Sequence, residues 1–128
     1  MEIGRLLTAM ITPFDENGEV NYEMSAKLAK AIIDSGSDGL VIGGTTGEAP
    51  TISDEEKLKL FSVVKESIGP DHALIAGTTN NNTKESVKLS KLAESTEVDG
   101  LLLTVPSYNK PTQDGLYKHF KSISEEVS

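Results

Sequence analysis

The 128-residue sequence has no cysteine, few basic residues and no long hydrophobic run. The absence of cysteine excludes disulfides, thiolate metal sites and a cysteine nucleophile. Its 12 Lys and Arg are outnumbered by 20 Asp and Glu, and the net charge of −8 argues against a nucleic-acid partner, because phosphate binding needs a basic surface. No run approaches the ~20 apolar residues that span a bilayer, and the N-terminal residues lack the pattern of a signal peptide. We therefore expect a cytoplasmic protein that binds neither membrane nor nucleic acid.

The sequence alternates four times between a short apolar run and a longer stretch of helical periodicity. The apolar runs are uniformly apolar, which is typical of parallel strands covered on both faces. The pattern predicts an α/β fold with one domain, residues 1–128, built from four consecutive βα units. The expected strands are residues 6–11, 40–42, 73–76 and 101–103, and the expected helices are residues 22–35, 54–68, 83–93 and 113–127.

Two architectures contain such units. A complete (β/α)8 TIM barrel takes about 250 residues, so four units would form its N-terminal half. A flavodoxin-like open sheet is the alternative, but residues 12–14 after the first strand offer neither a phosphate loop nor an acidic pocket. Asp38-Gly39-Leu40 and Asp99-Gly100-Leu101 each precede a strand, about two βα units apart, as a duplicated barrel segment would show. We favour the half barrel.

Helix boundaries and buried faces are also predictable. Ser53 and Glu56 have the spacing of a capping box, Asn82 is a weaker cap, and Gly36 and Gly69 are suited to helix ends. The apolar positions expected to face the core are Met24, Leu28, Ala31 and Ile32; Leu60, Phe61, Val64 and Ile68; Val87, Leu89, Leu92 and Ala93; and Leu116, Phe120, Ile123 and Val127.

Functional groups of parallel α/β folds gather at the carboxyl ends of the strands. The four loops expected there, residues 12–13, 43–48, 77–81 and 104–108, are rich in glycine, hydroxyls and amides and almost free of charge. Such loops suit a small anion held by backbone N–H groups and hydroxyls. Thr45 and Thr46 lie between glycines and are candidates for binding a carboxylate or passing a proton. The alternative is a tight strand-to-helix turn whose threonines cap backbone groups. Glu48 is a candidate general base or a buried partner of loop amides, and we favour the structural role.

Tyr108 is a candidate proton relay or oxyanion donor, and a packed surface aromatic is the alternative. His72 and His119 are isolated from each other and from other ligands at useful spacing, so we expect no metal site. We also expect the lysines on helix faces to be solvated. Lys110, the one lysine in the four loops, is a poor candidate for a Schiff base because it lies beyond Tyr108.

The loops and the segments around them resemble the dihydrodipicolinate synthase and N-acetylneuraminate lyase family of pyruvate-dependent aldolases. The paired threonines and the Tyr-Asn-Lys-Pro segment favour the synthase branch, and N-acetylneuraminate lyase is the alternative. The segments that carry the resemblance are Thr8-Ala9-Met10-Ile11-Thr12-Pro13-Phe14, Gly44-Thr45-Thr46-Gly47-Glu48, Ile75-Ala76-Gly77-Thr78, Tyr108-Asn109-Lys110-Pro111 and Gly115-Leu116-Tyr117-Lys118-His119-Phe120.

The resemblance implies a reaction and roles for named residues. The family condenses pyruvate with aspartate semialdehyde through a lysine Schiff base, in lysine biosynthesis and without a metal or organic cofactor. It implies that Thr45 and Tyr108 belong to a proton relay, with Tyr108 reaching across a dimer interface, and that Thr46 holds the pyruvate carboxylate. Asn81 and Glu85 match a pocket in which lysine inhibits many relatives, whereas Ser107 stands where a tyrosine is usual.

The family's Schiff-base lysine ends a sixth strand, and these 128 residues provide four strands. We therefore expect the chain to bind pyruvate or a similar keto acid and to be inactive alone. Two open sheet edges and an uncovered inner face predict a homo-oligomer, formed through the barrel edges and Tyr108. The alternative is a non-catalytic assembly module that pairs with a full-length relative or a separate C-terminal half.

Overall fold

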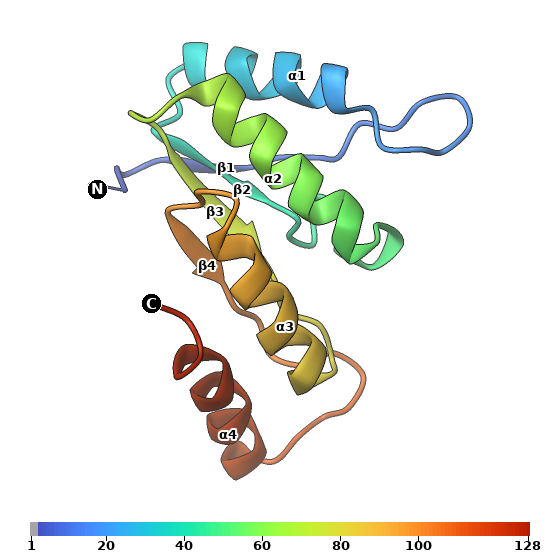
Figure 1. Cartoon of the computed structure of the whole chain (residues 1–128), viewed down its shortest axis with the longest axis vertical. Helices are drawn as coiled ribbons and strands as arrows, with labels where there is room; N and C mark the ends of the chain where they lie inside the picture. The colour runs from blue at the N-terminus through green and yellow to red at the C-terminus, as the bar shows by residue number, and fades with distance from the viewer. Residues whose placement is uncertain (1–2) are drawn as a thin grey trace.

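A computed structural model describes residues 3–128 as one parallel sheet with a helix after each strand (Figure 1). The strand order is β1-β2-β3-β4, so each new strand adds to the same edge of the sheet. This arrangement confirms the four consecutive βα units. Along the chain the elements are β1 (Leu7–Ala9), α1 (Tyr22–Asp34), β2 (Gly39–Ile42), the 3-10 helix η1 (Ala49–Thr51), α2 (Asp54–Ile68), β3 (Ala73–Gly77), α3 (Thr83–Glu94), β4 (Gly100–Leu102) and α4 (Gln113–Ser124).

The hydrophobic core lies between the helices and one face of the sheet. Strand register places Leu40 of β2 beside Leu74 of β3, and both are fully buried. Phe61 of α2 is fully buried in the same cluster. Helix α1 packs along α2, and α4 packs along α3. Burying side chains of this size is the main stabilising contribution, at roughly 1.5–3 kcal/mol each.

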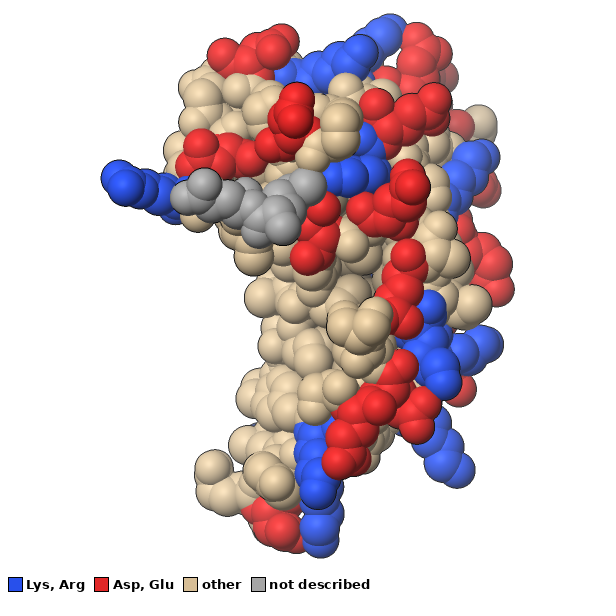
Figure 2. Space-filling model, turned by 60° about the vertical axis from the view of Figure 1, so that its left-hand side comes forward, with Lys and Arg blue, Asp and Glu red and all other residues tan. Residues whose placement is uncertain are grey.

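The opposite face of the sheet has no helical cover within residues 3–128. Ala9, Val41 and Ile75 lie in register on that face, and Ala9 is exposed. Leu102 at the β4 edge is 40% exposed. In Figure 2 charged side chains gather along the right-hand side, whereas the hollowed middle of the left-hand side is uncharged. Coverage on both faces, as the uniformly apolar runs suggest, is therefore absent for β1 and β4, and the uncovered inner face expected for a half barrel is present, because only the helical side of the sheet is filled.

The predicted helix caps are confirmed. The Ser53 hydroxyl accepts a hydrogen bond from the Glu56 N–H at 3.2 Å, and the Glu56 carboxylate accepts one from the Ser53 N–H at 2.8 Å. The side chain of Asn82 caps α3. Gly36 follows α1 with φ +104°, and Gly69 ends α2 with φ +78°. The sequence therefore encodes these ends through short-range chemistry.

The predicted helix faces are wrong at three positions. Met24, Ala31 and Leu92 are exposed, and small residues occupy the buried positions instead. The reason is that buried serines satisfy their hydroxyls locally, so they pack as small side chains. The buried serines are Ser25, which donates to the Asn21 carbonyl at 2.8 Å, Ser86, which donates to the Asn82 carbonyl at 3.0 Å, and Ser90, whose hydroxyl is 2.7 Å from that of Thr78.

The Asp-Gly repeat has the same structural role twice, at the amino ends of the strands. Asp38 accepts hydrogen bonds from the N–H groups of Arg5 and Leu6 at 2.7 and 2.8 Å. Asp99 accepts one from the Leu74 N–H at 2.8 Å, and it also binds the Lys65 ammonium at 2.7 Å. In each case a carboxylate before one strand fixes the start of the preceding strand. Across residues 3–128, none of the helices is long and apolar enough to cross a bilayer.

Candidate functional site

The loops that follow β1, β2 and β3 are joined by close contacts at the carboxyl ends of the strands. The buried Thr12 hydroxyl donates to the Gly47 carbonyl at 2.7 Å, which ties the first loop to the second. Gly43 and Gly77 touch through their backbones, since a Cβ on Gly77 would lie 2.4 Å from the Gly43 carbonyl oxygen. Glycine is therefore required where the second and third loops meet.

The third and fourth loops are joined by hydrogen bonds. The Thr79 hydroxyl accepts from the Thr104 N–H at 3.1 Å. The Asn109 amide donates to the Asn81 carbonyl at 2.7 Å. The expected convergence of the four loops is thus present, with each loop in contact with its neighbour.

A cavity of about 530 Å³ opens between the loops after β2, β3 and β4 and the start of α2. Its size is in the range of pockets for small molecules. Most of its polar groups are neutral hydroxyls, amides and backbone groups, and Asp54 and Lys57 supply opposite charges. The lining comprises Gly43, Gly44, Thr45, Ala49, Pro50, Ile52, Ser53, Asp54, Lys57, Gly77, Thr79, Asn80, Asn81, Leu102, Thr104, Val105 and Ser107.

The structure separates the two adjacent threonines. Thr45 lines the cavity, whereas Thr46 lies outside its lining, and both residues are exposed. Glu48 has φ +57°, and its backbone carbonyl accepts the Thr51 N–H and hydroxyl at 2.8 and 2.9 Å. Glu48 is exposed, so the expectation of a buried carboxylate that bonds loop amides is wrong. The backbone carbonyl of Glu48, and not its carboxylate, therefore stabilises this loop.

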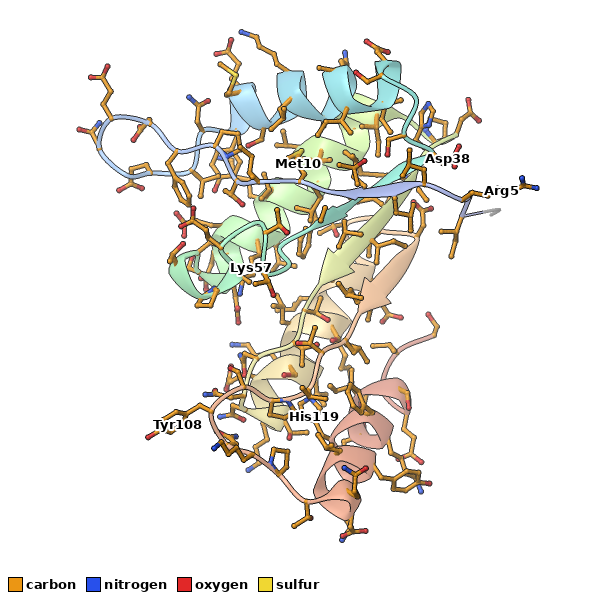
Figure 3. All side chains as sticks on the ribbon, turned by 180° about the vertical axis from the view of Figure 1, so that it is seen from behind. Arg5, Met10, Asp38, Lys57, Tyr108 and His119 are labelled. Atoms are coloured by element: carbon orange, nitrogen blue, oxygen red, sulfur yellow. The ribbon has the colours of Figure 1, made fainter. Side chains whose placement is uncertain are left out.

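Tyr108 does not join the cavity. The residue is 94% exposed with φ +68°, and its side chain points away from the molecule (Figure 3). Lys110 is also exposed and has φ +46°. A positive φ is uncommon for residues other than glycine, so the backbone of this loop is strained at both Tyr108 and Lys110. The phenol of Tyr108 is not buried. Asn81 lines the cavity, and Glu85 lies outside its lining.

Lys57 is the cavity residue that sequence reasoning missed. Only 8% of its side chain is exposed, and its ammonium lies 3.8 Å from the Asp54 carboxylate. The expectation that helix-face lysines are solvated is therefore wrong here, and Lys65 is a second exception with 11% exposed. A helical side chain covers the turn that precedes it, so a lysine four residues after the N-cap Ser53 points back toward the loops. The four-residue spacing from the N-cap is therefore the sequence signal that could have identified Lys57 as a residue of the cavity.

His119 is buried between α3 and α4, where its Nδ1 lies 2.9 Å from the Thr83 hydroxyl. Burial lowers the pKa of His119 below its usual value, because desolvation penalises the charged form. Its Nε2 has no hydrogen-bond partner within residues 3–128. The same residues contain no group of His, Asp and Glu side chains that could hold a metal ion.

The fold and site define a class of protein. Four parallel βα units carry a mostly uncharged cavity at their carboxyl ends, and this is the arrangement found in one half of a TIM-barrel enzyme. The chain belongs to the dihydrodipicolinate synthetase family, whose model matches residues 2–128.

Individual relatives agree with this assignment. The chain is 51% identical over 128 residues to the 4-hydroxy-tetrahydrodipicolinate synthase of Desulforudis audaxviator, and it covers 44% of that protein. The crystal structure of a dihydrodipicolinate synthase from Bacillus anthracis matches 99% of this chain with a TM-score of 0.95 and 44% identity. A chloride-inhibited dihydrodipicolinate synthase from Acinetobacter baumannii, complexed with pyruvate, matches 98% with a TM-score of 0.94 and 39% identity. In both structures the chain covers less than half of the relative, at 44% and 43%. The chain therefore has the fold of half of a TIM-barrel synthase.

Proposed function

We propose that this chain supplies the N-terminal half of a 4-hydroxy-tetrahydrodipicolinate synthase active site. Its loops bind pyruvate, Thr46 holds the pyruvate carboxylate, and the Thr45 hydroxyl passes protons. The amine that attacks the pyruvate carbonyl comes from a second set of βα units. In that step a C–N bond forms and water leaves, which yields the Schiff base that reacts with aspartate semialdehyde.

The observation that supports this proposal most strongly is the bonded cluster of four strand-end loops. The loops after β2, β3 and β4 place neutral hydroxyls and amides around a cavity, with Thr45 on its lining and Thr46 next to it on the same loop, outside the lining. Preorganised donors of this kind favour a carboxylate and developing negative charge. The relative from A. baumannii whose structure contains pyruvate supports the choice of keto acid.

The open face of the sheet supports a second set of βα units as the partner. Leu102 at one edge and Ile11 beyond the other are 40% and 57% exposed, and the strands β1 and β4 each have an unpaired edge in residues 3–128. The chain spans about 44% of the length of the relatives that it matches, so the region that follows in those relatives has the fold to cover this face. Without it, we expect self-association through the edges, with Tyr108 in the interface.

Borohydride reduction tests whether the amine that forms the Schiff base comes from outside this chain. The purified chain is incubated with pyruvate and borohydride, and its peptides are mapped by mass spectrometry. The expected result is no pyruvyl adduct on any lysine. Lys57 makes the test stringent, because it is the lysine on the cavity lining and only 8% of its side chain is exposed. An adduct on Lys57 would overturn the claim that the amine comes from elsewhere.

Complementation tests the hydroxyl roles. The chain is co-expressed with the region of the D. audaxviator synthase that follows the matched segment, and synthase activity is measured. We expect activity with the parent chain and a loss of about 100-fold or more with Thr45→Val, which removes a relay hydroxyl at nearly constant shape. Ser122→Ala, on the exposed surface of α4, is the matched control and retains activity. Equal activity of the two variants would exclude Thr45 from the relay.

The assembly-module hypothesis is the second candidate, and the open sheet face favours it equally. The two hypotheses predict different results. As an assembly module, the chain would co-purify with a full-length relative, and the complemented half barrel would have no synthase activity.

A further inference from the structure

The loop that carries Thr45 and Thr46 is fixed to the rest of the protein through Gly47. Both threonines are exposed, so packing does not hold their side chains, and the backbone of residues 44–48 sets where the two hydroxyls lie. Turn hydrogen bonds close this loop on itself, such as the one from the Gly47 N–H to the Gly44 carbonyl at 3.1 Å. These bonds define the shape of the loop and not its position against the neighbouring strand ends.

The Thr12 hydroxyl supplies the hydrogen bond that reaches this loop from another strand end. It donates to the Gly47 carbonyl at 2.7 Å, and both residues are buried. Within residues 3–128 no other hydrogen bond joins residues 44–48 to a segment outside residues 44–51, and the Gly47 carbonyl has no other donor. A buried carbonyl without a donor is costly, so this one hydroxyl decides whether Gly47 stays in place.

Thr12 is itself held on both sides. Met10 is 2% exposed, in the core where the chain leaves β1 (Figure 3). Pro13 restricts the backbone of the residue before it, and its carbonyl accepts the Asn21 N–H at 2.9 Å. The loop approaches this segment closely, since a Cβ on Gly47 would lie 3.2 Å from both the Met10 carbonyl oxygen and the Thr12 Oγ1. The first loop is therefore a firm support for the second.

We propose that Thr12 is a positioning residue for the condensation, which holds the loop so that the Thr45 and Thr46 hydroxyls face pyruvate. This inference rests on the proposed function, in which Thr46 holds the carboxylate and Thr45 passes protons. Thr12 acts through Gly47, because its hydroxyl is buried and donates to that carbonyl. A displacement of about 1 Å that starts away from the reacting atoms can cost about 100-fold in rate. Loss of this hydroxyl therefore impairs both pyruvate binding and turnover.

Hydrogen exchange of the chain, followed residue by residue in ¹H–¹⁵N spectra, tests whether Thr12 holds the loop. Thr12→Val keeps the shape of the side chain and removes the donor, so exchange of the Gly47 N–H is expected to rise about tenfold. Thr12→Ser keeps the donor and the parent rate. Thr96→Val is the matched control and leaves Gly47 exchange unchanged, because the buried Thr96 hydroxyl also donates at 2.7 Å to a carbonyl, but to that of Ala93.

Steady-state kinetics of the complemented enzyme separate positioning from a merely structural role. A chain that is only less stable gives less active enzyme, which lowers the apparent kcat and leaves the KM for pyruvate unchanged. Displacement of the threonine loop raises this KM as well, and we expect kcat/KM to fall about tenfold or more with Thr12→Val. Thr12→Ser restores both parameters, and Thr96→Val keeps the parent KM.

The positioning role is overturned if Thr12→Val leaves Gly47 exchange at the parent rate, if it lowers kcat alone, if Thr12→Ser behaves like Thr12→Val, or if Thr96→Val raises the KM as much. Failure of the proposed function gives a different result, in which the complemented parent chain has no synthase activity. The exchange rates of Gly47 then still decide whether Thr12 holds the loop.

Discussion

The contact between Gly43 and Gly77 predicts that Gly77→Ala both destabilises the sheet and opens the cavity. A Cβ at residue 77 would lie 2.4 Å from the Gly43 carbonyl oxygen, 2.7 Å from its carbonyl carbon and 3.0 Å from the Gly44 nitrogen. All three are backbone atoms, so no side-chain rotation relieves the overlap. Ordinary contact begins at 3.4 Å, and the ends of β2 and β3 must therefore move apart by about 1 Å.

Inserting a methyl group into packed structure costs about 1–3 kcal/mol, and the rigidity of the backbone contact places Gly77→Ala in the upper part of that range. Gly44→Ala is the matched control. Its Cβ would meet only Val41 Cγ1, at 3.9 Å, and its φ is not in the left-handed region. It removes freedom from the unfolded chain without a clash, so its free energy of unfolding changes by about 0–1 kcal/mol in the stabilising direction.

Urea unfolding followed by circular dichroism, at one fixed protein concentration, measures both variants. The Gly77→Ala midpoint is expected to fall and the Gly44→Ala midpoint to stay or rise. Pyruvate binding supplies the second readout, because the contact between Gly43 and Gly77 joins two of the loops proposed to bind it. Equal unfolding free energies for the two variants would show that the strand ends are not held together by this glycine contact.

Two further predictions concern pH. Hydrogen bonds from the Leu6 and Arg5 N–H groups lower the pKa of Asp38 in the folded chain. The stabilising contribution of Asp38 is therefore present above its pKa in the unfolded chain and is lost as the pH falls through its pKa in the folded chain. The urea midpoint of the parent chain should fall more steeply below pH 4 than that of Asp38→Asn. Burial lowers the pKa of His119, so the unfolded chain binds more protons and stability falls as the pH drops below about 7 toward the folded pKa. Urea midpoints between pH 8 and 5 should show that slope in the parent chain and not in His119→Gln, and identical slopes would contradict the assignment.

Short-range chemistry made much of the fold predictable. The capping box of Ser53 and Glu56 and the glycines after α1 and α2 act over a few residues, so their signatures in the sequence are direct. The exposed positions of Met24 and Leu92 were not predictable in this way. Hydropathy alone ranks methionine and leucine above serine, whereas Ser25 and Ser90 are buried because a carbonyl one turn away or a hydroxyl just after a neighbouring strand satisfies their hydroxyls.

The candidate site was predictable as a set of loops but not as a set of side chains. Strand ends of a parallel sheet must converge, which placed Thr45 and Asn81 at one cavity. Tyr108 is 94% exposed and Lys57 is 93% buried, with 7% exposed. The direction of Lys57 could be read from its spacing to the N-cap Ser53, but how far either side chain is buried depends on packing between elements, which a pattern of residue types does not carry.

The Asp-Gly repeat links stability to the completeness of the site. Asp38 and Asp99 each bind the start of the preceding strand, so the chain consists of two similar modules of two βα units, fixed at their amino ends. At the carboxyl ends each loop is instead fixed by the loop of the next strand, as the contacts from Thr12 to Asn109 show. The loops after β1 and β4 therefore each have one neighbour within residues 3–128, and strands added at those edges would supply the other. The same pairing would cover the exposed sheet face and restrain the outer loops of the site, so assembly and ligand binding should be thermodynamically coupled.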